Sequence, residues 1–220
     1  MYKCVVFDMD GTLVDSYPGI LHAYQQTFDK MDLPFPGEAF VKKAVGAPLR
    51  WVFSGLCGMD AQQPDRALAL YRDYYARKGR HEAAVYPGIP AVLENLRRSG
   101  CFVGVATLKN ETFALDMLKE LDLLSGIDAV CGMDARDQLT KADLVLRCMS
   151  LAGADREDTV LVGDSEFDAV GAREAGVAFL AVTYGFGFRQ PGSLEHNAVT
   201  MTADTPGGIA DSLGITQKTG

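Results

Sequence analysis

Two aspartates stand two residues apart directly after the first apolar run of the chain. Asp8 and Asp10 follow the run that ends at Phe7, and Gly11 and Thr12 come next. Ligands gather at the carboxyl ends of strands in a parallel sheet, so this position favours a functional site. Side chains two apart on a strand share a face, but a turn beginning at Gly11 can redirect Asp10 and leave its carbonyl facing a cation. The pair alone indicates a metal site or an acid–base site.

A second acidic pair follows a later apolar run. Asp164 ends residues 159–164, and Asp168 stands four residues further on. If the two strands are neighbours, Asp8, Asp164 and the Asp10 carbonyl offer the hard oxygen ligands that suit Mg²⁺. Asp168 then belongs to the outer part of the same metal site. The alternative for Asp164 and Asp168 is a solvated pair that caps the following helix.

Two further positions carry groups that suit a phosphoryl group. Thr107 ends an apolar run with a hydroxyl and is followed by free backbone N–H groups, the first of them on Leu108. Lys141 opens a helical pattern and can place a positive charge on a dianionic oxygen. Each residue alone has an ordinary reading, a helix cap for Thr107 and a surface lysine for Lys141. The order in which all these residues occur is what makes them candidate site residues.

The elements that must position these residues follow from short apolar runs separated by helical patterns. We expect buried strands at residues 2–8, 102–107, 129–132, 159–164 and 178–183. Helical patterns at 89–96, 111–123, 141–151 and 167–175 separate most of them, which predicts a Rossmann-like α/β core with a parallel sheet. Residues 17–85 contain helical patterns but no strand run. We therefore predict a core domain of residues 1–16 and 86–220 and a small helical cap domain of residues 17–85.

The composition narrows the class of protein. The chain has 220 residues, 48% of them hydrophobic, which is enough to bury a sizeable core. Its formal charge of −8 leaves no basic surface for a nucleic acid. The five cysteines form neither CxxC pairs nor His clusters, so no zinc site or disulfide framework is indicated. With no signal peptide or membrane span in the sequence, we expect a cytoplasmic protein without a membrane partner.

The order of DxDGT, threonine, lysine and GDxxxD resembles the haloacid dehalogenase superfamily and its phosphatase branch. DMDGTLVDS, YPGIPAVLENLRRSG, TKADLV and GDSEFDAVGAREAGV look like the phosphoglycolate phosphatase-like group. The resemblance implies that the helical insert is a mobile cap. Two positions depart from the family pattern: Leu108 stands where asparagine is frequent, and Ala142 follows Lys141 in place of a frequent proline.

The resemblance also implies a mechanism. Asp8 would attack phosphorus and form an aspartyl-phosphate, while Asp10 would protonate the leaving group and later activate water. Mg²⁺ and Lys141 would offset the negative charge of Asp8 and of the phosphate, and Thr107 would help to hold the phosphate oxygens. The groups expected to bind phosphate are those of Gly11, Thr12 and Leu108. In the turn at residues 45–50 of the cap, Arg50 is a candidate partner for an anionic leaving group.

Other activities remain open at this point. A phosphomutase of the beta-phosphoglucomutase type keeps the same motifs and differs chiefly in its cap, and a 5'-nucleotidase or pyrophosphatase shares the fold. If the protein is not an enzyme, the alternative is a non-catalytic domain with the same fold. The expected partner is a small phosphorylated metabolite, and the sequence leaves its identity and the oligomeric state open. Tyr71, Tyr74 and Tyr75 are expected to pack the insert's own core rather than to form a stacking platform.

Overall fold

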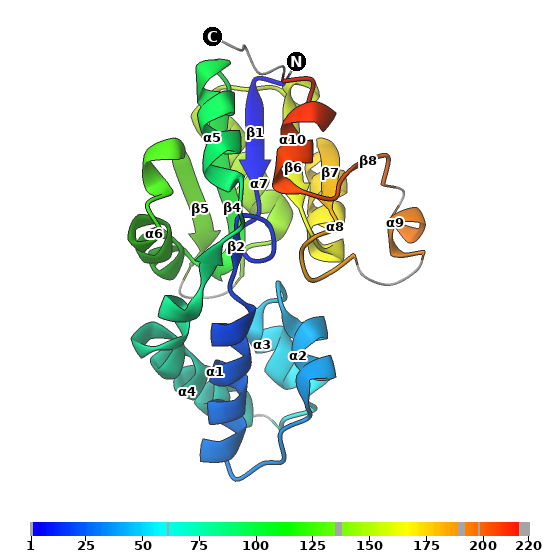
Figure 1. Cartoon of the computed structure of the whole chain (residues 1–220). Helices are drawn as coiled ribbons and strands as arrows, with labels where there is room; N and C mark the ends of the chain where they lie inside the picture. Colours follow the sequence, from blue (N-terminus) through cyan, green and yellow to red (C-terminus); the bar gives the residue numbers. More distant parts are fainter. Residues whose placement is uncertain (1, 61, 135–137, 189–191, 198, 216–220) are drawn as a thin grey trace.

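A parallel sheet of six strands forms the centre of the molecule (Figure 1). The computed structural model describes residues 2–60, 62–134, 138–188, 192–197 and 199–215. The strands lie in the order β5-β4-β1-β6-β7-β8, and every neighbouring pair is parallel. Their bounds are β1 Cys4–Phe7, β4 Phe102–Asn110, β5 Ala129–Met133, β6 Thr159–Gly163, β7 Ala178–Val182 and β8 Met201–Ala203. With helices on its flanks, this sheet confirms the predicted α/β fold class.

Alternate residues of β1 face two separate apolar clusters, as the period of a strand requires. Val5 and Phe7 belong to the larger cluster, which also contains buried residues of helices between β1 and β4 and of helices beyond β4. Three of these helices flank the sheet, namely α5 (Ile89–Arg98), α6 (Glu111–Glu120) and α10 (Pro206–Ser212). Cys4 and Val6 belong to the second cluster, together with buried residues of α7 (Lys141–Ala152) and α8 (Glu166–Ala175). The sheet is thus covered on both faces, which explains why its central strands are apolar throughout.

The segment between the first two strands of the sheet is helical, and residues 17–82 are called the helical insert below. It contains α1 (Tyr17–Lys30), α2 (Glu38–Ala44), α3 (Leu49–Trp51), a π-helical turn (Val52–Leu56), α4 (Gln63–Arg77) and a 3₁₀ turn (Gly79–Glu82). Two short antiparallel strands, β2 (Val14–Asp15) and β3 (Ala84–Val85), stand where the chain enters and leaves it. The arrowheads of β1 and β5 point toward the insert (Figure 1). The insert therefore lies beyond the carboxyl ends of the strands.

Several short elements differ from the sequence expectation, among them α9 (Ser193–His196) and α10, which are not predicted. The strand β8 and the ribbon of β2 and β3 are not predicted, because each has only two or three residues per strand. Within residues 17–85, for which helical patterns were expected, residues 49–56 are divided between α3 and a π-helical turn. Short elements of this kind are fixed by their neighbours rather than by their own periodicity. Within the part of the chain described, no helix is long and apolar enough to cross a membrane.

Candidate active site

Three buried carboxylates meet at the carboxyl end of the sheet. Asp8 follows β1 and Asp164 follows β6, and these two strands are neighbours in parallel register. Asp168 comes from the first turn of α8. One carboxylate oxygen from each of the three residues lies within 4.8 Å of the others. The adjacency of β1 and β6 thus brings together acidic residues that are about 160 positions apart in the sequence.

Backbone groups hold Asp164 in place. Its Oδ2 accepts hydrogen bonds from the backbone N–H groups of Phe186 at 2.6 Å and Gly187 at 3.2 Å. The hydroxyl of Thr12 is 3.5 Å from Asp164 Oδ1. Gly11 has a φ of +84°, and a Cβ there would stand 2.4 Å from Asp164 Oδ2. Gly11 is therefore required because a side chain at this position would collide with Asp164. Thr12 contacts the carboxylate of Asp164.

Lys141 lies buried between two of the carboxylates. Its Nζ is 2.6 Å from Asp8 Oδ1, 2.7 Å from Asp168 Oδ1 and 2.8 Å from the carbonyl oxygen of Ala106. Lys141 is the first residue of α7, because Thr140 and Asp143 form a capping box at this helix start. Burial by itself would lower the pKa of Lys141, but the carboxylates of Asp168 and Asp8 outweigh it and raise the pKa. Lys141 therefore carries a positive charge at the site.

Asp168 is engaged on both oxygens. Its Oδ2 accepts hydrogen bonds from the backbone N–H of Ser165 at 3.0 Å and from the Ser165 hydroxyl at 2.6 Å. Its Oδ1 forms the ion pair with Lys141. Asp168 thus caps α8 and also fixes the ammonium group of Lys141. The sequence alternative of a solvated capping pair is thus half right for this residue, because Asp168 caps the helix but is fully buried within the acidic cluster.

Burial raises the pKa of both strand-end carboxyl groups, Asp8 and Asp164. Desolvation raises the pKa of Asp8 to about 7, although the Lys141 ammonium opposes the shift. Desolvation and the negative charges of Asp168 and Asp8 raise the pKa of Asp164 well above its ordinary range. Two buried carboxylates that are costly to ionise indicate a site suited to a cation.

The donor set fits a hard divalent cation. Carboxylate oxygens of Asp8 and Asp164 are buried and close together, and Asp164 Oδ1 has a long contact, of 3.5 Å, to the hydroxyl of Thr12. Oxygen ligands of this kind are those that Mg²⁺ takes in proteins. Among the described residues, the cluster contains neither histidine nor cysteine. The chemistry of the site therefore favours a magnesium-type ion over zinc.

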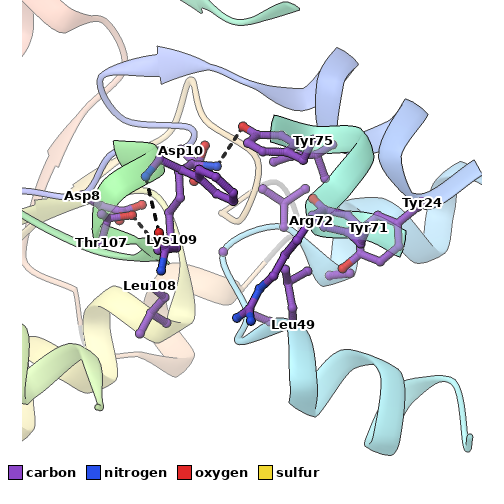
Figure 2. A pocket seen from close by; sticks show the side chains of 17 residues that line it. Asp8, Asp10, Tyr24, Leu49, Tyr71, Arg72, Tyr75, Thr107, Leu108 and Lys109 are labelled. Carbon is purple, nitrogen blue, oxygen red and sulfur yellow. Dashed lines mark hydrogen bonds and ion pairs between the residues drawn. The ribbon is translucent and has the colours of Figure 1, made fainter. Parts of the chain in front are cut away.

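A cavity opens over Asp8 and Asp10, and Figure 2 shows its two walls. Thr107 and Leu108, at the end of β4, line it on the sheet side, and the Thr107 hydroxyl accepts a hydrogen bond from the backbone N–H of Lys109 at 3.2 Å. The opposite wall comes from the helical insert, with Tyr24, Tyr71, Arg72 and Leu49 among its side chains. The cavity thus lies between the sheet and the insert.

Asp10 has two partners that the sequence analysis missed. The hydroxyl of Ser16 donates a hydrogen bond to Asp10 Oδ1. The ammonium of Lys109 is 3.2 Å from Asp10 Oδ2. Lys109 stands two residues after Thr107, but the register of β4 is irregular between Thr107 and Asn110, so the alternation of a strand gave no signal for it.

The structure does not bring Arg50 to the cavity. Its guanidinium forms an ion pair with Asp65 at 2.7 Å, and 53% of its side chain is exposed. Among the described residues that line the cavity, the arginine is Arg72 of α4. Figure 2 shows Arg72 and Leu49 projecting from the insert, across the cavity from Leu108. Arg72 is therefore the insert's cationic side chain at this place, because α4 rather than the turn at 45–50 carries it there.

The fold and the site define a hydrolase class, and comparisons with known proteins support this. The model of the family described as haloacid dehalogenase-like hydrolase matches residues 5–182. The chain is 33% identical to a phosphoglycolate phosphatase of Rhodospirillum rubrum, over all of this chain and 94% of the relative. It is 31% identical to a 5'-nucleotidase of Pseudomonas aeruginosa, over 84% of this chain and 85% of the relative.

A solved structure of similar sequence has the same fold. It is a predicted phosphatase from Clostridium acetobutylicum, with a TM-score of 0.90 and 31% identity over 97% of this chain and 98% of that one. This chain belongs to the haloacid dehalogenase-like hydrolase family. Within that family it is a phosphatase of the phosphoglycolate phosphatase-like group, which confirms the resemblance seen in the sequence.

Proposed function

We propose that this phosphatase depends on Mg²⁺ and hydrolyses a small phosphorylated acid such as phosphoglycolate through an aspartyl-phosphate on Asp8. One observation carries the proposal. The Asp8 carboxylate is buried beside Lys141 and close to Asp164, at the floor of a cavity that Asp10 also lines. This arrangement places a nucleophile and a second carboxyl group at one cavity, with a positive charge directly beside the nucleophile. Relatives named phosphoglycolate phosphatase support the choice of substrate.

The proposed mechanism divides the work between Asp8 and Asp10. Asp8 attacks phosphorus, and the bond from phosphorus to the leaving oxygen breaks as Asp10 gives its proton to that oxygen. Asp10 then takes a proton from the water that cleaves the aspartyl-phosphate and releases inorganic phosphate. Lys141 offsets negative charge at Asp8, while Thr107 and the N–H group of Leu108 bind phosphate oxygens. The N–H groups of Gly11 and Thr12, which were expected from the sequence to bind phosphate, instead donate to the carbonyl oxygens of Val14 and Met9. When bound, Mg²⁺ reduces the repulsion between Asp8 and the phosphate.

Asp8, Asp164 and the carbonyl oxygen of Asp10 would hold the metal ion. Asp164 is kept in position by the N–H groups of Phe186 and Gly187. Asp168 contributes from further out, since its two oxygens are already bound to Ser165 and Lys141. Groups that bind the metal ligands in this way fix the geometry of those ligands.

We propose that residues 17–85 act as a cap domain over a core of residues 1–16 and 86–220. Trp51 of α3 contacts Phe167 of α8, with 6.2 Å between ring centroids, so the insert touches the core beside the acidic cluster. A cap in this position can close over bound substrate and separate the reaction from bulk water. Arg72 replaces Arg50 as the side chain proposed to bind the anionic group of the substrate, because Arg72 lines the cavity.

The test is phosphate release from purified protein, with and without Mg²⁺, across phosphoglycolate, sugar phosphates and nucleotides. We expect the highest kcat/KM for phosphoglycolate, no turnover after chelation, and no turnover for Asp8→Asn. A covalent phosphate on Asp8, detected by mass spectrometry after rapid acid quenching, is the second expected result. Turnover by Asp8→Asn at the wild-type rate would refute the proposed nucleophile, and Mg²⁺-independent turnover would refute the metal requirement.

A 5'-nucleotidase is the second candidate, favoured by aromatic side chains that line the cavity. Tyr24, Tyr71, Tyr75 and Phe113 are among the lining residues, and a relative of similar length is named 5'-nucleotidase. Tyr71 and Tyr75, however, are buried and stacked on each other, with 10° between ring planes and 5.8 Å between centroids. Their faces are thus engaged in packing, which favours the smaller substrate. A higher kcat/KM for a nucleoside monophosphate in the same panel would reverse this order.

A further inference from the structure

A buried lysine at the site is used by none of the steps above. The side chain of Lys109 is only 9% exposed. Burying an ammonium group costs several kcal/mol unless partners compensate, so its partners are informative. They are Asp10, with 3.2 Å from Nζ to Oδ2, and Tyr75, with 2.8 Å from Nζ to Oη. Lys109 therefore connects the proposed proton donor to a second residue.

That second residue belongs to the helical insert. Tyr75 is on α4, while Lys109 is at the end of β4 in the sheet. The Lys109 ammonium also lies 4.3 Å from the centroid of the Tyr75 ring, within the range of a cation–π interaction. Figure 2 shows the dashed contacts from Lys109 to both Asp10 and Tyr75. A chain of contacts thus runs from Asp10 through Lys109 to the insert.

Tyr75 is itself held firmly. It is almost fully buried, it stacks on Tyr71, and its hydroxyl donates a hydrogen bond to Met117 Sδ at 3.5 Å. The Nζ of Lys109 is held between this fixed hydroxyl, at 2.8 Å, and Asp10 Oδ2, at 3.2 Å. A charged group with a fixed anchor can restrict the rotation of its carboxylate partner.

The two oxygens of Asp10 then have different attachments. Oδ1 is bound by Ser16, which precedes α1 at the entry to the insert, and Oδ2 is bound by Lys109. A carboxyl group that must meet the leaving oxygen in one orientation benefits from both constraints, since small misplacements slow a reaction strongly.

We propose that Lys109 is a positioning residue which, anchored by Tyr75, orients the Asp10 carboxyl for proton donation. The position of the insert and the orientation of Asp10 are thereby set together. This inference rests on the proposed function, because it takes Asp10 to be the proton donor to the leaving group.

The test compares two phosphate esters with different leaving groups. An alkyl phosphate needs a proton on its leaving oxygen, whereas p-nitrophenyl phosphate releases a stable anion without one. General acid catalysis contributes about 10²–10⁴-fold, so a badly oriented Asp10 should lower kcat/KM for the alkyl ester by at least about tenfold. The value for p-nitrophenyl phosphate should fall much less. Measurement of kcat/KM is required because it covers steps up to departure of the leaving group.

The variants are Lys109→Met, Tyr75→Phe and their combination. Tyr75→Phe keeps the ring and removes only the hydroxyl, so it should show the same preference between esters with a smaller loss. Because both residues act through one contact, the double variant should lose no more than Lys109→Met alone. The controls are Lys3→Met, an exposed lysine, and Tyr2→Phe, whose hydroxyl likewise faces a methionine sulfur, that of Met201 at 4.0 Å. Neither control variant should change kcat/KM for either ester.

Three outcomes would overturn the inference. They are an equal loss for both esters in Lys109→Met, an additive double variant, and a Tyr75→Phe enzyme identical to wild type. If Lys109→Met fails to fold, as judged by thermal unfolding, the ester preference of Tyr75→Phe decides. Asp10→Asn separates this inference from the proposed function. If Asp10→Asn lowers kcat/KM equally for both esters, the proposed role of Asp10 fails. If Asp10→Asn affects the alkyl ester more strongly but the Lys109 and Tyr75 variants do not, only the role of Lys109 is wrong.

Discussion

Gly171→Ala tests whether the contact between α7 and α8 sets the position of Lys141. A Cβ on Gly171 would stand 2.3 Å from Lys141 Cγ and 2.7 Å from Lys141 Cβ. Ordinary carbon contacts are about 3.5–4.0 Å, so the two helices must separate or the lysine must move by about 1 Å. The lysine stem cannot turn away freely, because its Nζ is bound to Asp8, Asp168 and the Ala106 carbonyl.

The expected effects on stability and on activity differ in size. Replacing glycine inside a helix by alanine gains about 1 kcal/mol of helix propensity, while overpacking costs about 1–3 kcal/mol. The net free energy of unfolding should therefore fall by no more than about 2 kcal/mol. A displacement of 1 Å at a catalytic group can lower the rate about 10²-fold, and we expect a kcat/KM loss of about that size.

The assay combines urea unfolding with phosphate release at saturating Mg²⁺. Gly207→Ala in α10 is the matched control, because it is also a helical glycine but has no neighbour closer than 4.0 Å to the added Cβ. The control should keep full activity and gain stability slightly. A Gly171→Ala enzyme with wild-type kcat/KM would refute the reasoning, since it would show that Lys141 tolerates displacement or that the helices move apart without effect.

Two further predictions concern the cavity wall and the buried carboxylates. Loss of one charge-assisted hydrogen bond costs about 1.5–3 kcal/mol, so Arg72→Ala should lower kcat/KM for phosphoglycolate about 10–100-fold and leave p-nitrophenyl phosphate unchanged. Arg50→Ala should change neither, and an equal loss on both esters in Arg72→Ala would contradict the assignment. Desolvation raises the pKa of Asp8 from 3.8 to about 7, so the metal-free folded state binds a proton in this interval that the unfolded state has released. The free energy of unfolding in a chelator should therefore fall as pH rises from about 4 to about 7, and Mg²⁺ should restore more stability at pH 7.5 than at pH 5.5. Urea unfolding at the two pH values measures this, and a stability that rises with pH in the chelator would exclude the assigned direction.

The main sheet and its acidic edge were predictable because their signals are local and repeated. Each apolar run that ends in Asp8, Thr107 or Asp164 marks a buried strand and its carboxyl end at once. Parallel topology then brings those ends to one edge. The strand β8, residues 201–203, escaped prediction because three residues carry too little periodicity to identify a strand.

The contacts across the cavity could not be predicted in the same way. Arg50 and Arg72 both belong to helical patterns of the insert, and only the packing of α4 places Arg72 at the cavity. The partnership of Lys109 with Tyr75 joins two elements 34 residues apart, which no spacing rule connects. In contrast, the capping of α8 by Ser165 and Asp168 could be read from their spacing, because a capping box is local.

The contact of Trp51 with Phe167 has a practical consequence. Trp51 is the only tryptophan of the sequence, and its indole ring meets the Phe167 ring at 77° while 48% of the residue remains exposed. Any separation of the insert from α8 removes the contact with Phe167 and exposes more of this indole to water. Its emission should then shift to longer wavelength, and the return of the insert should reverse the shift. The unlabelled enzyme thus carries an intrinsic fluorescent reporter, with which stopped-flow mixing can time closure separately from phosphate release.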